Sequence, residues 1–200
     1  MKIMLNLETL GTRPGCVITS VGAVAFNTKS ILYEFYERVD IKNSAEMGFH
    51  MEAPTVMWWM EQKDASRMEL TKSGKPIAAV VSAFTDWVEA CAKDEALASS
   101  DGSLEVWGNG VGFDNAILAE AYRKCTRDTP WKFWEDRCYR TLKALHEDTP
   151  FVASGVNHNA LDDARSQALH LIQILNKRYP ASSPRVTPAL PPDTTPTPEP

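Results

Sequence analysis

The chain has 200 residues, 44% of them hydrophobic, which is enough apolar surface for one substantial core. Its formal net charge of −5 argues against a protein that coats nucleic acid with a broad basic surface, although an acidic metal site would itself add negative charge. The four cysteines show no metal-ligand spacing, so we expect reduced thiols in a cytoplasmic protein. Charged residues come too early for a signal peptide, and no apolar run approaches the length needed to cross a membrane.

The first forty residues predict three strands. Residues 3–7 form a short apolar run, and residues 17–26 and 31–39 are rich in β-branched and aromatic side chains. Residues 27–30, Asn-Thr-Lys-Ser, separate the second run from the third and predict a hairpin turn.

The following elements are mainly helical. Apolar spacing predicts helices over 55–62, 77–92, 114–125, 141–146 and 160–179, with a short strand at 104–107 and a strand or turn after Arg137. Strands followed by helices that alternate with further strands predict an α/β fold, a mixed sheet with helices on its faces.

The C-terminal residues differ in composition from the rest. Residues 180–200 are dominated by Pro, Thr and Ser, so they cannot bury enough apolar surface to offset the entropy of ordering. We expect one domain over 1–179 and a disordered Pro- and Thr-rich tail over 180–200, more simply a passive extension than a tether for a partner.

Asn6 and Glu8 are polar side chains in the first predicted strand. Residues two apart project to the same face of a strand, so both point one way from an otherwise apolar segment. They then require polar partners or a metal ion, unless the strand lies at an edge and they face solvent.

Asp114 begins a predicted helix, where Asp is also a favoured N-cap. The preceding loop, residues 108–112, contains three glycines around Asn109, so a ligand can approach its backbone closely. Phe113 and Trp107 offer flat apolar surfaces for a base or sugar, although core packing explains Phe113 more simply.

His158 and Asp163 flank the start of the last predicted helix. Asn159 is a plausible N-cap with Asp162 at the third helical position, which assigns Asp162 a structural role and leaves Asp163 for chemistry.

In their order and spacing these segments resemble the DEDDh 3′→5′ exonucleases. The family pattern is Asp-x-Glu in the first strand, an Asp opening a helix after a Gly/Asn loop, and His-x4-Asp entering the last helix; this chain has Asn6 where the first Asp is expected. The stretches LETLGTRPGCVITSVGAVAF and WGNGVGFDNAIL are most similar to the phage and prophage branch often labelled exonuclease VIII-like.

The resemblance implies an RNase H-like fold, two Mg²⁺ or Mn²⁺ ions, and release of nucleotides from the free 3′ end of a DNA strand. Glu8 and Asp163 would hold the ion that activates water, Asp114 would support the second ion, and position 6 would bridge both. His158 would be the general base. The residues implied to bind substrate are Thr9, Leu10, Gly11, Asn109 and Phe113.

Asn6 presents one neutral carbonyl oxygen where a carboxylate is expected, so we predict an impaired enzyme with an intact fold. Either an engineered change or a natural loss of catalysis explains it, and the four matching positions favour the first.

Two alternatives stay open: a catalytically silent module that binds nucleic-acid ends or a protein partner, and an exoribonuclease. A homodimer is expected by analogy only. Trp58 and Trp59 could stack on a base or form a lid, but we favour core packing or a dimer contact for this pair.

Overall fold

The computed structural model describes residues 1–98, 102–156 and 158–178. The predicted tail over 180–200 lies outside these residues, as does Tyr179 at the end of the last predicted helix. The strands are β1 (Lys2–Thr9), β2 (Ile18–Phe26), β3 (Ile31–Arg38), β4 (Glu105–Gly108) and β5 (Asp136–Cys138). The α-helices are α1 (Ile41–Glu46), α2 (Ala53–Met60), α3 (Asp64–Glu69), α4 (Ile77–Cys91), α5 (Asp114–Lys124), α6 (Tyr139–Ala144) and α7 (Ala160–Arg178).

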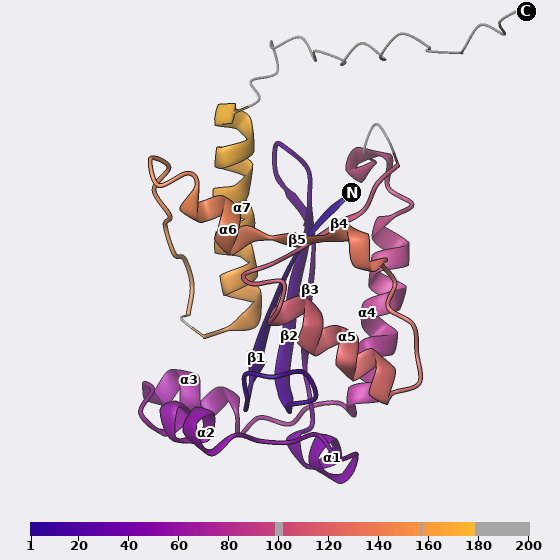
Figure 1. Ribbon diagram of the computed structural model, residues 1–200, viewed down its shortest axis with the longest axis vertical. Coiled ribbons are helices and arrows are strands. Elements are labelled where there is room, and N and C mark those ends of the chain that lie inside the picture. Colours follow the sequence, from indigo (N-terminus) through magenta and orange to yellow (C-terminus); the bar gives the residue numbers. More distant parts are fainter. Residues whose placement is uncertain (99–101, 157, 179–200) are drawn as a thin grey trace, which may run out of the picture.

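The strands form one mixed sheet in the order β3-β2-β1-β4-β5 (Figure 1). The two pairs β1–β2 and β2–β3 are antiparallel, and Asn27 closes the turn between β2 and β3 by accepting hydrogen bonds from the N–H groups of Lys29 and Ser30. The pairs β1–β4 and β4–β5 are parallel. The predicted mixed α/β sheet and the hairpin turn are therefore confirmed.

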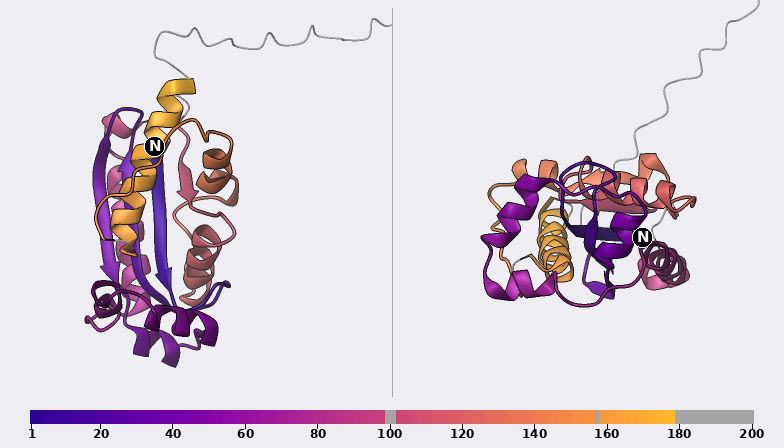
Figure 2. Two further views of the ribbon diagram at one scale, coloured as in Figure 1. Left: turned by 90° about the vertical axis from the view of Figure 1, so that its left-hand side faces the viewer. Right: turned by 90° about the horizontal axis from the view of Figure 1, so that it is seen from below.

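Helices cover both faces of this sheet. Figure 1 shows α7 on one side of it and α4 with α5 on the other, and Figure 1 and the left view of Figure 2 place α1, α2 and α3 at one end. No helix within the described part of the chain is both long and apolar enough to span a membrane.

The central strand β1 divides the core because its side chains alternate between the two faces. Ile3, Leu5 and Leu7 pack in a large core that includes Ile77, Val80, Val81 and Phe84 from α4. Met4 points the other way, into a second core with residues of α7. Asn6 and Glu8 continue the Met4 face, so they point toward α7, as the alternation in the sequence predicts.

Gly22 on β2 allows α7 to begin close to the sheet. It pairs with Asn6 of β1, and a Cβ atom at this position would lie 2.2 Å from the backbone carbon of Ala160 and 2.3 Å from the nitrogen of Leu161. Only a glycine allows the backbones of β2 and α7 to come this close. The close contact places the first turn of α7 over the end of β1 that carries Glu8.

Several element boundaries differ from the sequence predictions. Helix α2 begins two residues before position 55, because Pro54 occupies its first turn, where proline is tolerated. Helices α1 and α3 were not expected; each has only six residues, too few for a clear apolar repeat. Asp114 does not cap α5, because Phe113 is the N-cap residue and Asp114 already lies in the first turn.

Candidate metal-dependent active site

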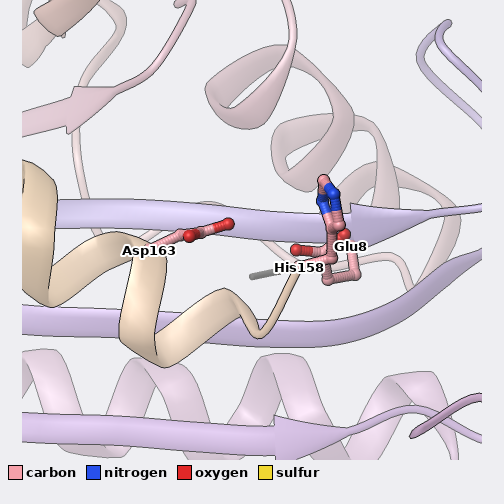
Figure 3. A group of neighbouring side chains, drawn as sticks. All are labelled: Glu8, His158 and Asp163. Carbon is pink, nitrogen blue, oxygen red and sulfur yellow. The ribbon is translucent and has the colours of Figure 1, made fainter. Parts of the chain in front are cut away.

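Glu8, His158 and Asp163 converge at the end of β1. Each offers one ligand atom, and these atoms all lie within 4.8 Å of one another. Figure 3 shows Glu8 on the strand, Asp163 on the first turn of α7 and His158 on the segment just before that helix. Residues about 150 positions apart in the sequence are thus brought together by the packing of α7 on β1.

The segment before α7 is held by local hydrogen bonds. The side chain of Asn159 accepts hydrogen bonds from the N–H groups of Leu161 and Asp162, which confirms it as an N-cap. Asp162 accepts one from Val156 N–H at 2.9 Å and one from Arg165 at 2.6 Å, in agreement with a structural role. His158 lies between these contacts with a φ of 62°, a left-handed conformation that is uncommon outside glycine and recurs at functional sites.

Asn6 is buried beside this group and pairs with a residue that the sequence analysis did not single out. Gln167 Nε2 donates a hydrogen bond of 3.2 Å to Asn6 Oδ1, while Gln167 Oε1 is buried with no hydrogen-bond partner among the described residues. Gln167 follows Asp163 by four residues, so it lies on the same face of α7. This spacing is the signal that could have identified it.

Asp114 approaches from the opposite face of the sheet. It is 2% exposed, and its Oδ1 accepts a hydrogen bond of 3.2 Å from the backbone N–H of Leu7, between Asn6 and Glu8. Its carboxylate is therefore anchored to β1 outside the Glu8, His158 and Asp163 group, yet close enough for its charge to act on Glu8.

The three carboxyl groups have raised pKa values. Burial raises the pKa of Glu8 to about 8, with further contributions from the charges of Asp163 and Asp114. Burial raises the pKa of Asp114 to about 7, against the hydrogen bonds it accepts from Leu7 and Asn109. The pKa of Asp163 is also raised, chiefly by burial, although the nearby His158 lowers it.

This donor set fits a divalent cation. Within the described part of the chain no Lys or Arg forms a direct ion pair with Glu8, Asp114 or Asp163. Carboxylate oxygens are the ligands that Mg²⁺ and Mn²⁺ favour. A cation here would offset the repulsion that contributes to these raised pKa values.

An open cavity of about 500 Å³ lies over the carboxylates. Among the residues predicted to bind substrate, those that line it are Thr9, Gly11, Asn109 and Phe113. Leu10 does not line it; its side chain is 6% exposed and packs in the larger core, because successive residues of an extended chain alternate in direction.

Trp58 and Trp59 also line the cavity. Trp59 is buried and donates a hydrogen bond of 2.8 Å from Nε1 to the carbonyl of Thr9, in agreement with the predicted core packing. Trp58 is 40% exposed, and its ring meets the His158 imidazole edge to face at a centroid distance of 4.9 Å. Trp58 is therefore not a core residue: its indole forms part of the cavity wall, and the dimer contact that we also predicted for this pair stays a prediction.

Comparison with family models gives one match of nearly full length. The model described as the 3′-5′ exoribonuclease Rv2179c-like domain matches residues 1–175. Comparison with curated proteins gives no significant match.

Solved structures of nucleases share the fold. The nuclease domain of 3′hExo, a DEDDh family member bound to rAMP, is 14% identical with a TM-score of 0.55, over 88% of this chain and 92% of that one. Exonuclease X in complex with 5′ overhanging duplex DNA is 16% identical with a TM-score of 0.54, over 88% and 92%. Pop2p of S. pombe in its Mg²⁺- and Mn²⁺-bound form is 11% identical with a TM-score of 0.50, over 88% and 83%. The predicted RNase H-like fold of the DEDDh exonucleases is confirmed, while the closer resemblance to the phage branch stays a prediction.

Proposed function

Because the chain belongs to the Rv2179c-like 3′-5′ exoribonuclease domain family, we propose that it is built to hydrolyse the phosphodiester bond at the 3′ end of a nucleic-acid strand. The observation that carries this proposal is the convergence of Glu8, His158 and Asp163 within 4.8 Å of one another, with Asn6 and Asp114 beside them.

Two Mg²⁺ or Mn²⁺ ions would supply Lewis-acid charge at this site and lower the pKa of a bound water. Glu8 and Asp163 would hold the ion that serves the attacking water, Asp114 would support the ion that serves the leaving 3′ oxygen, and position 6 would be a ligand to both. The His158 imidazole accepts the proton of the water. Its edge-to-face contact with Trp58 fixes the plane of the ring, so that a ring nitrogen stays directed at the site.

The terminal nucleotide occupies the cavity over the carboxylates. Thr9 and Gly11 lie at the end of β1, and the Thr9 hydroxyl donates a hydrogen bond of 2.6 Å to the carbonyl of Gly11, which fixes the turn. Trp58 and Phe113 supply apolar surface for the base and sugar.

RNA is the substrate class that the family description supports, so we propose RNA in place of the DNA strand expected from the sequence. A site that distinguishes the two must contact the 2′-hydroxyl group. Digestion of 3′-labelled RNA and DNA strands of one sequence tests this choice, and faster digestion of DNA would reverse it.

Asn6 is the feature that weakens catalysis in this proposal. Its amide is nearly isosteric with a carboxylate but lacks the charge that a bridging ligand provides. Changes in the outer shell of a metal site commonly cost about 10- to 100-fold in activity, so a missing ligand should cost at least as much. We therefore expect Asn6→Asp to raise the rate of digestion in Mg²⁺ by at least roughly a hundredfold.

The matched control is Asn6→Asp combined with Glu8→Gln, which restores one carboxylate and removes another and should remain as slow as the unchanged chain. Equal digestion by the unchanged chain and the Asn6→Asp variant would show that the role given to position 6 is wrong. If neither digests RNA or DNA, the silent binding module becomes the better account.

A further inference from the structure

A second cavity, of about 570 Å³, lies beside the first, and the catalytic proposal leaves it without a role. Asn109 lines both cavities, so they adjoin at the loop between β4 and α5. Whereas the first cavity is bounded by carboxyl groups, the second contains the cationic side chains of Arg140 and Lys143.

Arg140 and Lys143 are three residues apart on α6, so they lie on the same face of that helix. The guanidinium group of Arg140 lies over Gly110, where a Cβ atom would be only 3.5 Å from Nη2. Burial raises the pKa of Asp114, and the charge of Arg140 is among the contributions that oppose this rise. Arg140 thus lines the second cavity and is close enough to Asp114 for its charge to act on that carboxyl group.

Lys143 and Phe151 contact each other in the lining of the second cavity. The Lys143 ammonium lies 4.3 Å from the centroid of the Phe151 ring, and Phe151 is 38% exposed. Proteins that bind single strands combine cationic side chains, which contact the phosphates, with aromatic rings, on which the bases stack.

Thr149 adds a hydroxyl group that the fold does not use. Its backbone is fixed, since its N–H donates to the carbonyl of His146 and its own carbonyl forms a 2.8 Å hydrogen bond with His170 Nε2. The residue is 9% exposed and lines the cavity, yet Oγ1 has no hydrogen-bond partner in the described part of the chain. A hydroxyl group is both donor and acceptor, so this one can form a hydrogen bond with a ligand in the cavity.

We propose that the second cavity binds the phosphodiester and sugar of the nucleotide that precedes the terminal one. This inference rests on the proposed function, because it takes the 3′ terminus to occupy the first cavity. Glu147 also lines the second cavity. The net positive charge of the cavity is therefore small, which suits one or two phosphates rather than a long stretch of backbone. The two cavities would then bind successive parts of the strand. The carboxyl groups of the first cavity face the bond to be cleaved, and the Arg and Lys side chains of the second cavity face the next phosphate.

The test measures binding by the unchanged chain, which carries Asn6, in Mg²⁺. The probes are adenosine 5′-monophosphate and oligoadenylates of two and four residues, each in ribose and deoxyribose form. We expect the dinucleotide to bind more tightly than the mononucleotide. The double variant Arg140→Met with Lys143→Met should abolish this gain: it should bind oligoadenylate about tenfold more weakly, the size of effect that one or two phosphate-neutralising cations have, while its affinity for the mononucleotide is unchanged.

The salt dependence gives an independent measure. For a single strand, the slope of log K against log salt changes by about 0.7 for each phosphate that a cationic side chain neutralises. Removing both cations should therefore make the slope shallower by roughly 0.7 to 1.4 units. The matched control is Lys29→Met with Lys93→Met, which removes the same charge near the β2–β3 turn and the end of α4, and should bind like the unchanged chain.

Thr149→Val separates binding from folding. Because the hydroxyl has no partner within the described residues, its removal should leave the melting temperature unchanged or higher, and we expect severalfold weaker oligoadenylate binding. Equal affinity of all variants for the oligoadenylates, or an equal decrease for mononucleotide and oligonucleotide, would overturn the inference. Neither result would touch the proposed function, which cleavage by the Asn6→Asp variant decides separately; dinucleotide binding by the unchanged chain that is no tighter than mononucleotide binding would likewise overturn the inference alone.

Discussion

Glu8 is the residue on which the electrostatics of the site depend most. With a pKa of about 8, it retains a proton at neutral pH in the metal-free protein, because burial and the charges of Asp163 and Asp114 oppose its ionisation. A divalent cation must displace that proton in order to bind. Metal binding should therefore release protons below about pH 8, and the metal-free fold should be sensitive to pH.

The free energy of unfolding of the metal-free protein should fall between about pH 5 and pH 8. The pKa of Glu8 rises from 4.5 to about 8 and that of Asp114 from 3.8 to about 7, so over this range the folded state holds protons that the unfolded state has released. This contribution to stability is complete below the unfolded values and disappears as pH rises through the folded ones. Urea denaturation in EDTA at a series of pH values measures it.

Glu8→Gln provides the control for this effect, because it removes the group with the higher pKa and leaves the side chain nearly isosteric. Its stability should change less over the same range and exceed that of the unchanged chain at about pH 8. A stability of the unchanged chain that rises with pH across this range would contradict the assignment.

At the scale of the elements, the close approach of α7 to β2 decides whether the site forms. His158 and Asp163 are positioned by the first turn of α7, and this turn lies against the backbone of Gly22. A side chain at position 22 must push the helix away from the sheet, and Asp163 would move with it.

Gly22→Ala should destabilise the protein by about 1–3 kcal/mol or more, as expected when extra atoms are forced into a packed interior. It should also abolish the digestion gained by Asn6→Asp. The matched control is Gly112→Ala, since a Cβ atom there meets nothing within 4 Å and should change stability by no more than about 0.5 kcal/mol. Urea denaturation compares the two, and equal stabilities would show that Gly22 does not set the position of α7.

The longer elements could be predicted from the sequence because their patterns are local. The alternation of β1 placed Asn6 and Glu8 on one face. The apolar repeats of α4 and α7 predicted the bounds of both helices to within a residue or two. The short helices α1 and α3 carry no such repeat. The Trp58 contact with His158 joins residues 100 positions apart, and no local rule reveals which way that indole turns.

The anchoring of Asp114 shows the same limit. Its position at the start of a helix suggested a cap, yet its carboxylate bonds to the N–H of Leu7, a residue 107 positions earlier. Only the parallel pairing of β1 with β4 brings the two together. Gln167, by contrast, could have been found from its spacing to Asp163.

For the whole molecule, the site draws on the central strand and on the helices of both faces of the sheet. Glu8 lies on the central strand, Asp114 begins a helix on one face and Asp163 lies in the helix on the other. Cations held by these residues would link both helical layers to β1 and offset the repulsion among the carboxylates.

The most direct measurement is anomalous diffraction from crystals of the Asn6→Asp variant grown with Mn²⁺ and a short oligonucleotide. We expect two Mn²⁺ peaks, one bound by Glu8 and Asp163 and one on the side of Asp114, with the carboxylate at position 6 between them. Mn²⁺ bound elsewhere, or no peak among these side chains at saturating Mn²⁺, would contradict the account.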